Sequence, residues 1–225
     1  MSILLLSDLH LGSPLSDCDK EIINLINNPK FELIYIVGDL IDEWEANPIK
    51  IVGDHQDLID TIKNSPDRVK IVMGNHDPDI VFMSSLFEGN GVADHFSVEG
   101  IMIIHGHQFD YMVKNYEWMY RLVFPIHWVL ERLGINVKGF LAEVIHSIAA
   151  KKQKKYYDDL VMAIEKEAVK EYGMFQHVVM GHTHLGKIAD GDTTYVNCGS
   201  MTHDKTYVEY DEGVFYLKGV KDNVV

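Results

Sequence analysis

The chain has 225 residues, 47% hydrophobic and 24% charged, a composition typical of a globular protein with a sizeable core. That apolar content excludes a disordered chain, and only two cysteines, Cys18 and Cys198, argue against a disulfide framework and for a reducing, cytoplasmic setting. A net charge of −14 disfavours a protein that coats nucleic acid. No apolar run approaches the roughly 20 residues that span a bilayer, and the short run Ile3–Leu6 does not predict a signal peptide.

Five short apolar runs, each followed at once by Gly or by polar residues, predict buried β-strands. In chain order they are Ile3–Leu6, Leu33–Val37, Ile71–Met73, Ile101–Ile104 and Val178–Met180. Amphipathic stretches at Asp17–Asn28 and Asp54–Lys63 predict helices between the first three runs, and this alternation predicts an α/β fold with parallel pairing. Three later strand-like runs, 194–197, 206–210 and 214–217, predict an antiparallel edge or a second sheet.

Side chains that can bind metal ions follow all five of these runs. The set is Asp8, His10, Asp39, Asn75, His105, His182 and His184. Because ligands of α/β folds bind beyond the carboxyl ends of the strands, we expect the set to meet at one sheet edge. Seven ligands exceed the four of a tetrahedral zinc and suit two ions that share a carboxylate such as Asp39. Nitrogen and oxygen ligands without thiolate suit divalent transition metals, with Mn²⁺ preferred over Zn²⁺ or iron.

Two such ions about 4 Å apart activate a water molecule and stabilise both oxygens of an in-line displacement at phosphorus. The residues therefore predict hydrolysis of a phosphodiester, pyrophosphate or phosphomonoester bond by a metal-bound hydroxide. A single Asp or His at a strand end usually only caps the strand or forms a hydrogen bond. Five strands that all end in such residues favour a common metal site instead. Two residues keep open alternatives, because His107 is either structural or a partner of a ligand, and Asp42 either bonds a ligand histidine or caps the next segment. The remaining histidines are expected to be ordinary core or surface residues: His55, His95, His127, His146, His177 and His203.

Five segments in a fixed order resemble the five motifs of calcineurin-like metallophosphoesterases. They are Asp8-Leu9-His10, Gly38-Asp39-Leu40-Ile41-Asp42, Gly74-Asn75-His76-Asp77, His105-Gly106-His107 and Gly181-His182-Thr183-His184. The resemblance implies a four-layer αββα sandwich of two mixed sheets with a binuclear centre. It implies one ion on Asp8, His10, Asp39 and His184, and another on Asp39, Asn75, His105 and His182. It also implies that Asn75 and His76 contact the substrate, that His76 is catalytic, and that Asp77 acts with it by accepting its other ring N–H.

The 76 residues between His105 and His182 are far more than one connection needs. We therefore expect a single domain, 1–225, with a helical cap insertion at about 108–172. Apolar spacing predicts three cap helices, 112–133 with a kink at Pro125 and a stop at Gly134, then 140–148, then 157–172. The cap is a candidate lid, homo-oligomer contact or, through the basic run 151–155, peripheral membrane contact. A plain solvated surface is the simpler interpretation of that run.

A cap between the fourth and fifth motifs, the opening Ser7–Leu11 and Trp44 are similar to the UDP-2,3-diacylglucosamine hydrolase branch. That similarity implies a phosphorylated small-molecule substrate such as an acylated nucleotide sugar. The branch usually carries Arg at the position of His76 and Asp at the position of His107. Two alternatives stay open: a nuclease or cyclic-nucleotide phosphodiesterase on the same centre, and, from another class, a non-catalytic interaction scaffold.

Overall fold

The fold contains two β-sheets and is seen in a computed structural model that describes residues 1–111, 113–115 and 153–220, without the side chains of 153–158. The first sheet consists of β1 (Ser2–Leu6), β2 (Leu33–Val37), β3 (Val69–Val72), β4 (Val92–Ala93), β10 (Thr206–Asp211) and β11 (Val214–Gly219). The second consists of β5 (His95–Val98), β6 (Ile101–Ile104), β7 (His177–Met180), β8 (Lys187–Ala189) and β9 (Thr194–Asn197). Their orders are β11-β10-β1-β2-β3-β4 and β5-β6-β7-β9-β8.

Both sheets are mixed, each with a parallel centre and antiparallel pairing toward at least one edge. Strands β1 to β4 pair in parallel, and β10 and β11 extend that sheet in antiparallel fashion. In the second sheet β6, β7 and β9 are parallel, whereas β5 and β8 are antiparallel to their neighbours. All eight predicted strands are present. Both alternatives left open for the three later runs occur, since 194–197 forms β9 of the second sheet, parallel to β7 and antiparallel to β8, while 206–210 and 214–217 form the antiparallel edge β10–β11 of the first sheet.

The continuous apolar run of β1 reflects burial on both faces of the first sheet. Ile3 and Leu5 pack between the two sheets, together with Val179 of the second sheet. Leu4 and Leu6 point the other way and belong to the cluster beneath the helices on the outer face. A strand whose side chains alternate between two cores cannot show a polar face, which explains why the sequence shows no alternation there.

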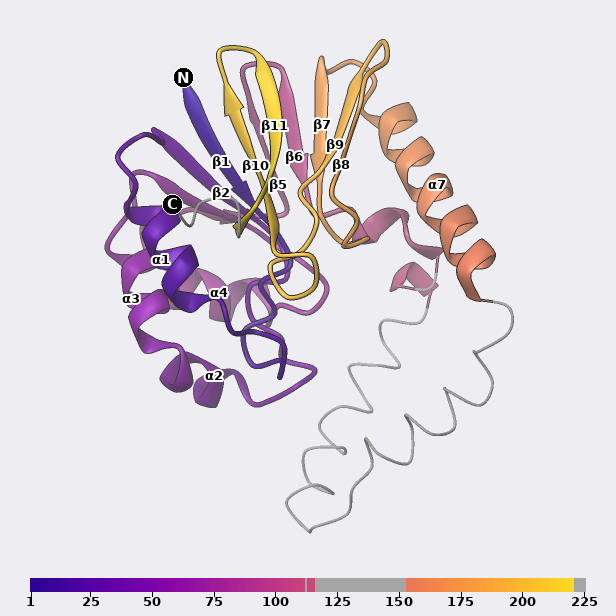
Figure 1. Cartoon of the computed structure of the whole chain (residues 1–225). Coiled ribbons are helices and arrows are strands. Elements are labelled where there is room, and N and C mark those ends of the chain that lie inside the picture. Colours follow the sequence, from indigo (N-terminus) through magenta and orange to yellow (C-terminus); the bar gives the residue numbers. More distant parts are fainter. Residues whose placement is uncertain (112, 116–152, 221–225) are drawn as a thin grey trace.

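Helices cover the outer faces of both sheets, which gives four layers (Figure 1). The first sheet is covered by α1 (Asp19–Asn27), α3 (Gln56–Lys63) and α4 (Ile80–Leu86). The second sheet is covered by α7 (Gln153–Glu171), whose Ile164 and Ala168 pack with Ile104 and Val178. The predicted αββα sandwich of two mixed sheets is confirmed.

Only the ends of the predicted cap fall within the described residues. The short 3₁₀ helix η1 (His107–Phe109) leads into it, and α7 contains most of the third predicted helix. Because α7 packs on the second sheet, this part of the insertion supplies a layer of the sandwich. Residues 113–115 of the predicted helix 112–133 are helical, whereas the rest of that helix, the predicted helix 140–148, the kink at Pro125, the stop at Gly134 and the start of the basic run lie outside the described residues.

The predicted helix Asp54–Lys63 is present as α3, and a separate helix that the sequence did not predict, α2 (Pro48–Asp54), precedes it, with His55 between them at φ −113° and ψ 30°. Asn47 begins α2, since its side chain accepts the backbone N–H of Ile49 and Pro48 fits the first helical turn. Among the helices of the described residues, none combines the length and apolar content needed to cross a bilayer.

Candidate metal centre

The polar clusters meet at one end of the sandwich, where loops from both sheets come together. Loops after β1, β2 and β3 arrive from the first sheet, and loops after β6 and β7 arrive from the second. Backbone bonds join these loops, from the His10 N–H to the Asp39 carbonyl (2.8 Å) and from the Gly181 N–H to the His105 carbonyl (3.1 Å). The expectation of a single sheet edge is therefore wrong, because the clusters come from the matching ends of two packed sheets.

The backbone of this end is strained at the predicted ligands themselves. Positive φ angles occur at Asp8 (53°), His10 (44°), Asp39 (51°), His182 (65°) and His184 (57°). They are five of the eight non-glycine residues with positive φ in the described part of the chain. Such conformations cost free energy and concentrate at functional sites, where they aim a side chain that an ordinary strand or helix would direct elsewhere.

Two glycines let the loops approach each other closely. A Cβ on Gly74 would lie 2.1 Å from Asp39 Oδ1 and 2.3 Å from the Asp39 backbone nitrogen. A Cβ on Gly181 would lie 1.7 Å from Ser7 Oγ. The ligand loops can therefore pack as they do only without a side chain at these two positions.

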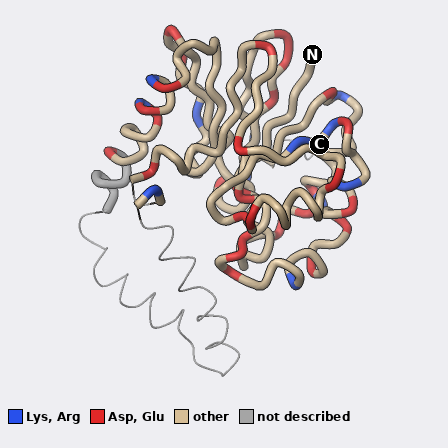
Figure 2. The backbone as a smooth tube through the Cα atoms, turned by 180° about the vertical axis from the view of Figure 1, so that it is seen from behind, with Lys and Arg blue, Asp and Glu red and all other residues tan. Residues whose placement is uncertain are grey.

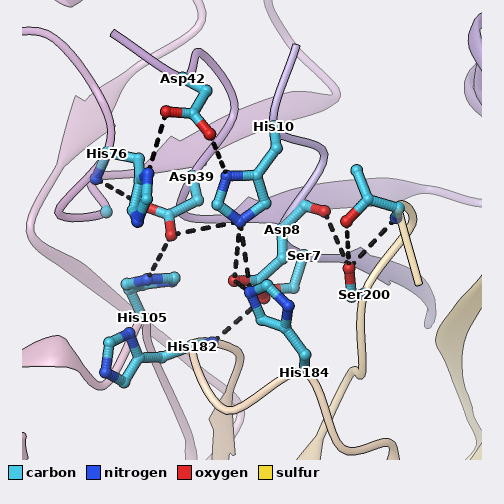
Figure 3. A network of polar contacts seen from close by, with 12 residues as sticks. Ser7, Asp8, His10, Asp39, Asp42, His76, His105, His182, His184 and Ser200 are labelled. Atoms are coloured by element: carbon cyan, nitrogen blue, oxygen red, sulfur yellow. Dashed lines mark hydrogen bonds and ion pairs between the residues drawn. The ribbon is translucent and has the colours of Figure 1, made fainter. Parts of the chain in front are cut away.

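The first predicted ligand group converges (Figure 3). Asp8 Oδ1 lies 3.0 Å from His184 Nε2, and His10 Nε2 lies 3.2 Å from the same nitrogen. Asp39 Oδ2 lies 3.6 Å from His10 Nε2. Ligand atoms of Asp8, His10 and His184 are within 4.8 Å of one another, as are those of Asp8, Asp39 and His105. The four residues assigned to the first ion thus surround one small volume.

Asp39 joins the two predicted groups. Its Oδ2, already close to His10, also lies 3.2 Å from His105 Nε2. His105 Nδ1 donates to the Val37 carbonyl at 2.9 Å, so a neutral His105 ring presents the lone pair of Nε2 to the carboxylate. Two acceptors facing each other repel unless a positive charge lies between them. One carboxylate oxygen shared by histidines of both groups is the arrangement expected of a bridging ligand.

Three buried nitrogen or oxygen atoms of the site make no hydrogen bond within the described residues, although two of them lie close to an ionisable group: Asn75 Oδ1, Asp8 Oδ1 (3.0 Å from His184 Nε2) and His105 Nε2 (3.2 Å from Asp39 Oδ2). Buried polar atoms without partners are costly, and each such atom in a folded protein calls for an explanation. All three belong to predicted ligands and offer oxygen or nitrogen lone pairs. The donor set therefore fits divalent cations that take mixed nitrogen and oxygen ligands.

His182 reaches the site but contacts a residue that the sequence did not single out. Its ring stands beside that of His105, with centroids 5.2 Å apart, and its backbone N–H donates to Asp8 Oδ2 at 3.1 Å. Its Nε2 lies 3.1 Å from Asp110 Oδ2. Asp110 follows η1 within the segment interpreted as the start of the cap, and no spacing rule links it to the five clusters.

The role predicted for Asp77 needs a correction. The side chain that accepts from His76 Nδ1 is Asp42, at 3.0 Å, and its second oxygen accepts from His10 Nδ1 at 2.9 Å. Asp77 accepts the backbone N–H groups of Ile41 and Gly74, both at 2.8 Å, so it holds the two loops together. Both interpretations left open for Asp42 have a counterpart in the structure, since it bonds His10, a predicted ligand, and its Oδ1 also accepts the backbone N–H of Trp44 at 3.2 Å in the next segment.

The ring of His76 is fixed from two directions. Trp44 lies against it with ring centroids 3.8 Å apart, and the backbone N–H of His76 donates to Asp39 Oδ1 at 2.9 Å. His10, Asp42 and His76 also form a group with closely spaced ligand atoms. Their nitrogens and oxygens already bond one another, so this group is a hydrogen-bonded support and not a third ion site.

Buried carboxylates make the electrostatic field of the site negative. Burial alone would lower the pKa of His105, but the charge of Asp39 outweighs it and raises that pKa to about 10. Burial alone would raise the pKa of Asp42, but hydrogen bonds from His10 and His76 lower it to about 2. Burial and the neighbouring charge of Asp39 raise the pKa of Asp77 to about 7. A field that favours positive charge on imidazoles also favours a bound cation.

Two further histidines approach the ligands. The His107 ring centroid lies 5.5 Å from that of His105, and His107 is in none of the groups of closely spaced ligand atoms found in the described residues. His203, expected to be an ordinary residue, places its Nδ1 3.3 Å from the Nδ1 of His184. It lies between β9 and β10, 19 residues after His184, which is too far for a local spacing pattern to show.

Comparison with known proteins agrees with this arrangement. The model of the calcineurin-like phosphoesterase family matches residues 1–186. No curated protein matches the sequence. Among solved structures, the chain is similar to YfcE, a phosphoesterase from E. coli, with a TM-score of 0.55 and 16% identity over 99% of this chain and 94% of that one. It is also similar to a single mutant of Vps29 from Entamoeba histolytica, with a TM-score of 0.50 and 12% identity over 97% of both chains.

Proposed function

Because this chain belongs to the calcineurin-like phosphoesterase family, we propose that it hydrolyses a phosphoester bond at a pair of divalent metal ions. The observation that carries the proposal is the position of Asp39 Oδ2 between His10 and His105, next to buried acceptors that make no hydrogen bond within the described residues. The residues that would hold one ion are Asp8, His10, Asp39 and His184. Those that would hold the other are Asp39, Asn75, His105 and His182.

When bound, the ions supply Lewis acidity and lower the pKa of a coordinated water, which makes phosphorus chemistry feasible at neutral pH. The protein's part is to hold the ligand oxygens and nitrogens in place before substrate arrives. Asp42 does so for His10, and the Val37 carbonyl does so for His105, because each fixes Nδ1 and leaves Nε2 pointing inward. Mn²⁺ is the proposed metal, since the ligands combine oxygen and nitrogen donors and contain no thiolate.

His76 is the proposed proton donor to the leaving oxygen. Burial lowers its pKa, but the charge of Asp39 and the hydrogen bond to Asp42 outweigh burial and raise it. With Nδ1–H held by Asp42, the protonated ring carries its second proton on Nε2. Trp44 packs against one side of the ring, so the direction of that proton is set. A general acid with these properties protonates a leaving alkoxide or phosphate oxygen.

The proposed substrate is a phosphorylated small molecule, with an acylated nucleotide sugar such as UDP-2,3-diacylglucosamine as one compound to test. Figure 2 supports a small substrate, because Lys and Arg are scattered over the described backbone and form no continuous stripe for a polynucleotide. A cyclic-nucleotide phosphodiesterase remains compatible with that distribution. Homo-oligomerisation, peripheral membrane contact, the cap at about 108–172 and cytoplasmic location stay predictions.

The direct test is hydrolysis of bis-p-nitrophenyl phosphate and p-nitrophenyl phosphate with Mn²⁺, Zn²⁺ or Fe²⁺. We expect metal-dependent turnover by the wild type and a loss of at least about 100-fold in Asp39→Asn, which removes the shared negative charge. Asp60→Asn is the matched control, since Asp60 is exposed on α3. Full activity in Asp39→Asn would contradict the mechanism. Adding nucleotide sugars, cyclic nucleotides and oligonucleotides to the screen separates the substrate classes.

A non-catalytic interaction module is the second candidate, supported by the likeness to Vps29. This candidate predicts a different result in the hydrolysis screen, because a scaffold needs neither turnover nor a tightly bound metal. A folded wild type that stays inactive with every metal and substrate in the screen would favour this alternative.

A further inference from the structure

We propose that His203 is a positioning residue that holds the ring of His184 in the tautomer needed to bind a cation. The two Nδ1 atoms lie 3.3 Å apart, and the opposite nitrogen of His184, Nε2, lies 3.0 Å from Asp8 Oδ1. This inference rests on the proposed function, since it assigns Nε2 of His184 to the first metal ion.

The proton inventory of the His184 ring gives the reason. A neutral imidazole carries one N–H, and a metal ion occupies the lone pair of the nitrogen that binds it. If Nε2 of His184 binds the ion, Nδ1 must keep the proton and needs an acceptor. Nδ1 of His203 fills that role when His203 keeps its own proton on Nε2. His10 and His105 follow the same rule with Asp42 and the Val37 carbonyl as acceptors.

His184 depends on such a partner more than the other two histidines do. Its side chain is 26% exposed, against 8% for His10 and 0% for His105. Packing therefore does less to fix the orientation of the His184 ring. A hydrogen bond at Nδ1 removes the rotation about the Cβ–Cγ bond that would otherwise turn Nε2 away from Asp8.

The turn that carries His203 is fastened to the ligand loop. Ser200 is fully buried, and its hydroxyl lies 3.3 Å from the Asp8 carbonyl oxygen (Figure 3). The same hydroxyl oxygen accepts the backbone N–H of Thr202 at 3.1 Å and that of His203 at 3.4 Å. The position of His203 is therefore set relative to Asp8, one of the residues that share the ion with His184.

The hydroxyl of Thr202 is compatible with this scheme. It lies 3.1 Å from His203 Nδ1 and 2.7 Å from Ser200 Oγ. When Thr202 donates to Ser200 and Ser200 donates to the Asp8 carbonyl, each hydroxyl proton has an acceptor. The single lone pair of His203 Nδ1 then accepts from His184, and the 3.1 Å contact with Thr202 Oγ1 is not a hydrogen bond in this arrangement.

Three substitutions of His203 separate positioning from bulk. His203→Asn puts a carbonyl oxygen close to the position of Nδ1, whereas His203→Gln puts one near the position of Nε2, and His203→Ala removes both. In calorimetric titrations of the full chain with Mn²⁺, the wild type should bind about two equivalents. One of the two should weaken by roughly 10–100-fold in His203→Ala and His203→Gln, and remain within about threefold of wild type in His203→Asn. His95→Gln, exposed on β5, is the matched control.

The outcomes distinguish this inference from the proposed function. A wild type that binds no divalent metal contradicts the proposed function itself. A wild type that binds both ions, with His203→Ala and His203→Gln binding them equally well, overturns only the role of His203. Ring-nitrogen NMR of the Zn²⁺-loaded protein gives an independent readout and should show the His184 proton on Nδ1; a proton on Nε2 would overturn the inference. Because His203 is exposed, thermal unfolding of the variants should match the wild type.

Discussion

The apolar space between the two sheets and the polar end of the sandwich are built from the same strands but follow different rules. Between the sheets, Ile3, Val37, Ile103 and Val179 are fully buried aliphatic side chains in regular strands. A few residues further along the same strands, buried carboxylates, positive φ angles and buried acceptors without a hydrogen bond in the described part of the chain are concentrated. These features lower the stability of the fold. A region where several of them occur together is expected to be functional, because they are retained where function requires them.

The two sheets contribute different side chains to the polar end. Loops of the first sheet supply all the carboxylates among the predicted ligands, whereas loops of the second supply only imidazoles: His105, His182 and His184. Neither sheet alone carries a complete ligand set. The polar end therefore depends on the packing of the apolar region that holds the two sheets together.

The largest effect on stability is expected from a methyl group in the polar end. Gly74→Ala forces a Cβ against the backbone nitrogen of Asp39, so the loop must move. We expect the free energy of unfolding to fall by about 3 kcal/mol, measured by urea denaturation. Gly53→Ala is the control: nothing lies within 4 Å of its Cβ in helix α2, and it should gain up to roughly 1 kcal/mol. Equal behaviour of the two variants would mean that the loops are not tightly packed.

Adding metal should raise the free energy of unfolding by stabilising the buried acceptors of the polar end. If the buried acceptors bind divalent ions only in the folded state, a ligand at 100 times its dissociation constant adds about 2.7 kcal/mol of stability. For a chain of this length that corresponds to a rise in Tm of roughly 5–10 °C, measured with Mn²⁺ against EDTA. Asp8→Asn should lose most of this shift. An unchanged Tm in the wild type would indicate that the strained end is stable without a cation.

Asp42 and Asp77 should differ in what they affect. Asp42→Asn weakens the hydrogen bonds that hold His10 and His76, so kcat/KM should fall by about 10–100-fold while Tm changes little. Asp77→Asn replaces one of the two carboxylate oxygens that accept backbone N–H groups with an amide nitrogen. It should therefore lower Tm clearly, while kcat/KM of the protein that remains folded falls less. The reverse pattern would restore Asp77 as the partner of His76.

The smallest effect is expected in the apolar region. Ile103→Val removes one methylene from a fully buried position between the sheets and should cost about 1 kcal/mol of unfolding free energy. Metal affinity and kcat/KM should stay at wild-type values, because the ligand loops keep their positions. A large loss of metal affinity in this variant would show that the two regions are more tightly coupled than the structure indicates.

The apolar pattern predicted the central fold because central strands such as β1 and β6 are buried on both faces. It missed β4, which has two residues, and β5 and β8, which are partly exposed and carry His95 or Lys187 among few apolar residues. Helix α4 was missed as well, although Asp79 caps it through the backbone N–H groups of Val81 and Phe82. How the strands divide between two sheets depends on packing over long sequence distances, which a local pattern does not contain.

The ligand loops were predictable because chemistry places Asp, Asn and His directly after buried strands. The side chains that support the ligands were not. Asp110 and His203 reach His182 and His184 from loops that share no spacing with the motifs. Asp42 and Asp77 occupy similar motif positions, and only the course of the backbone decides which of them meets His76.

The most direct test is the metal content of the purified full chain, measured by mass spectrometry after equilibration with Mn²⁺ and removal of the free ion. Two neighbouring cation positions sharing Asp39 predict close to two metal equivalents per chain for wild type and a clear deficit in Asp39→Asn. A wild type that retains well under one equivalent, with Asp39→Asn indistinguishable from it, would contradict the binuclear site.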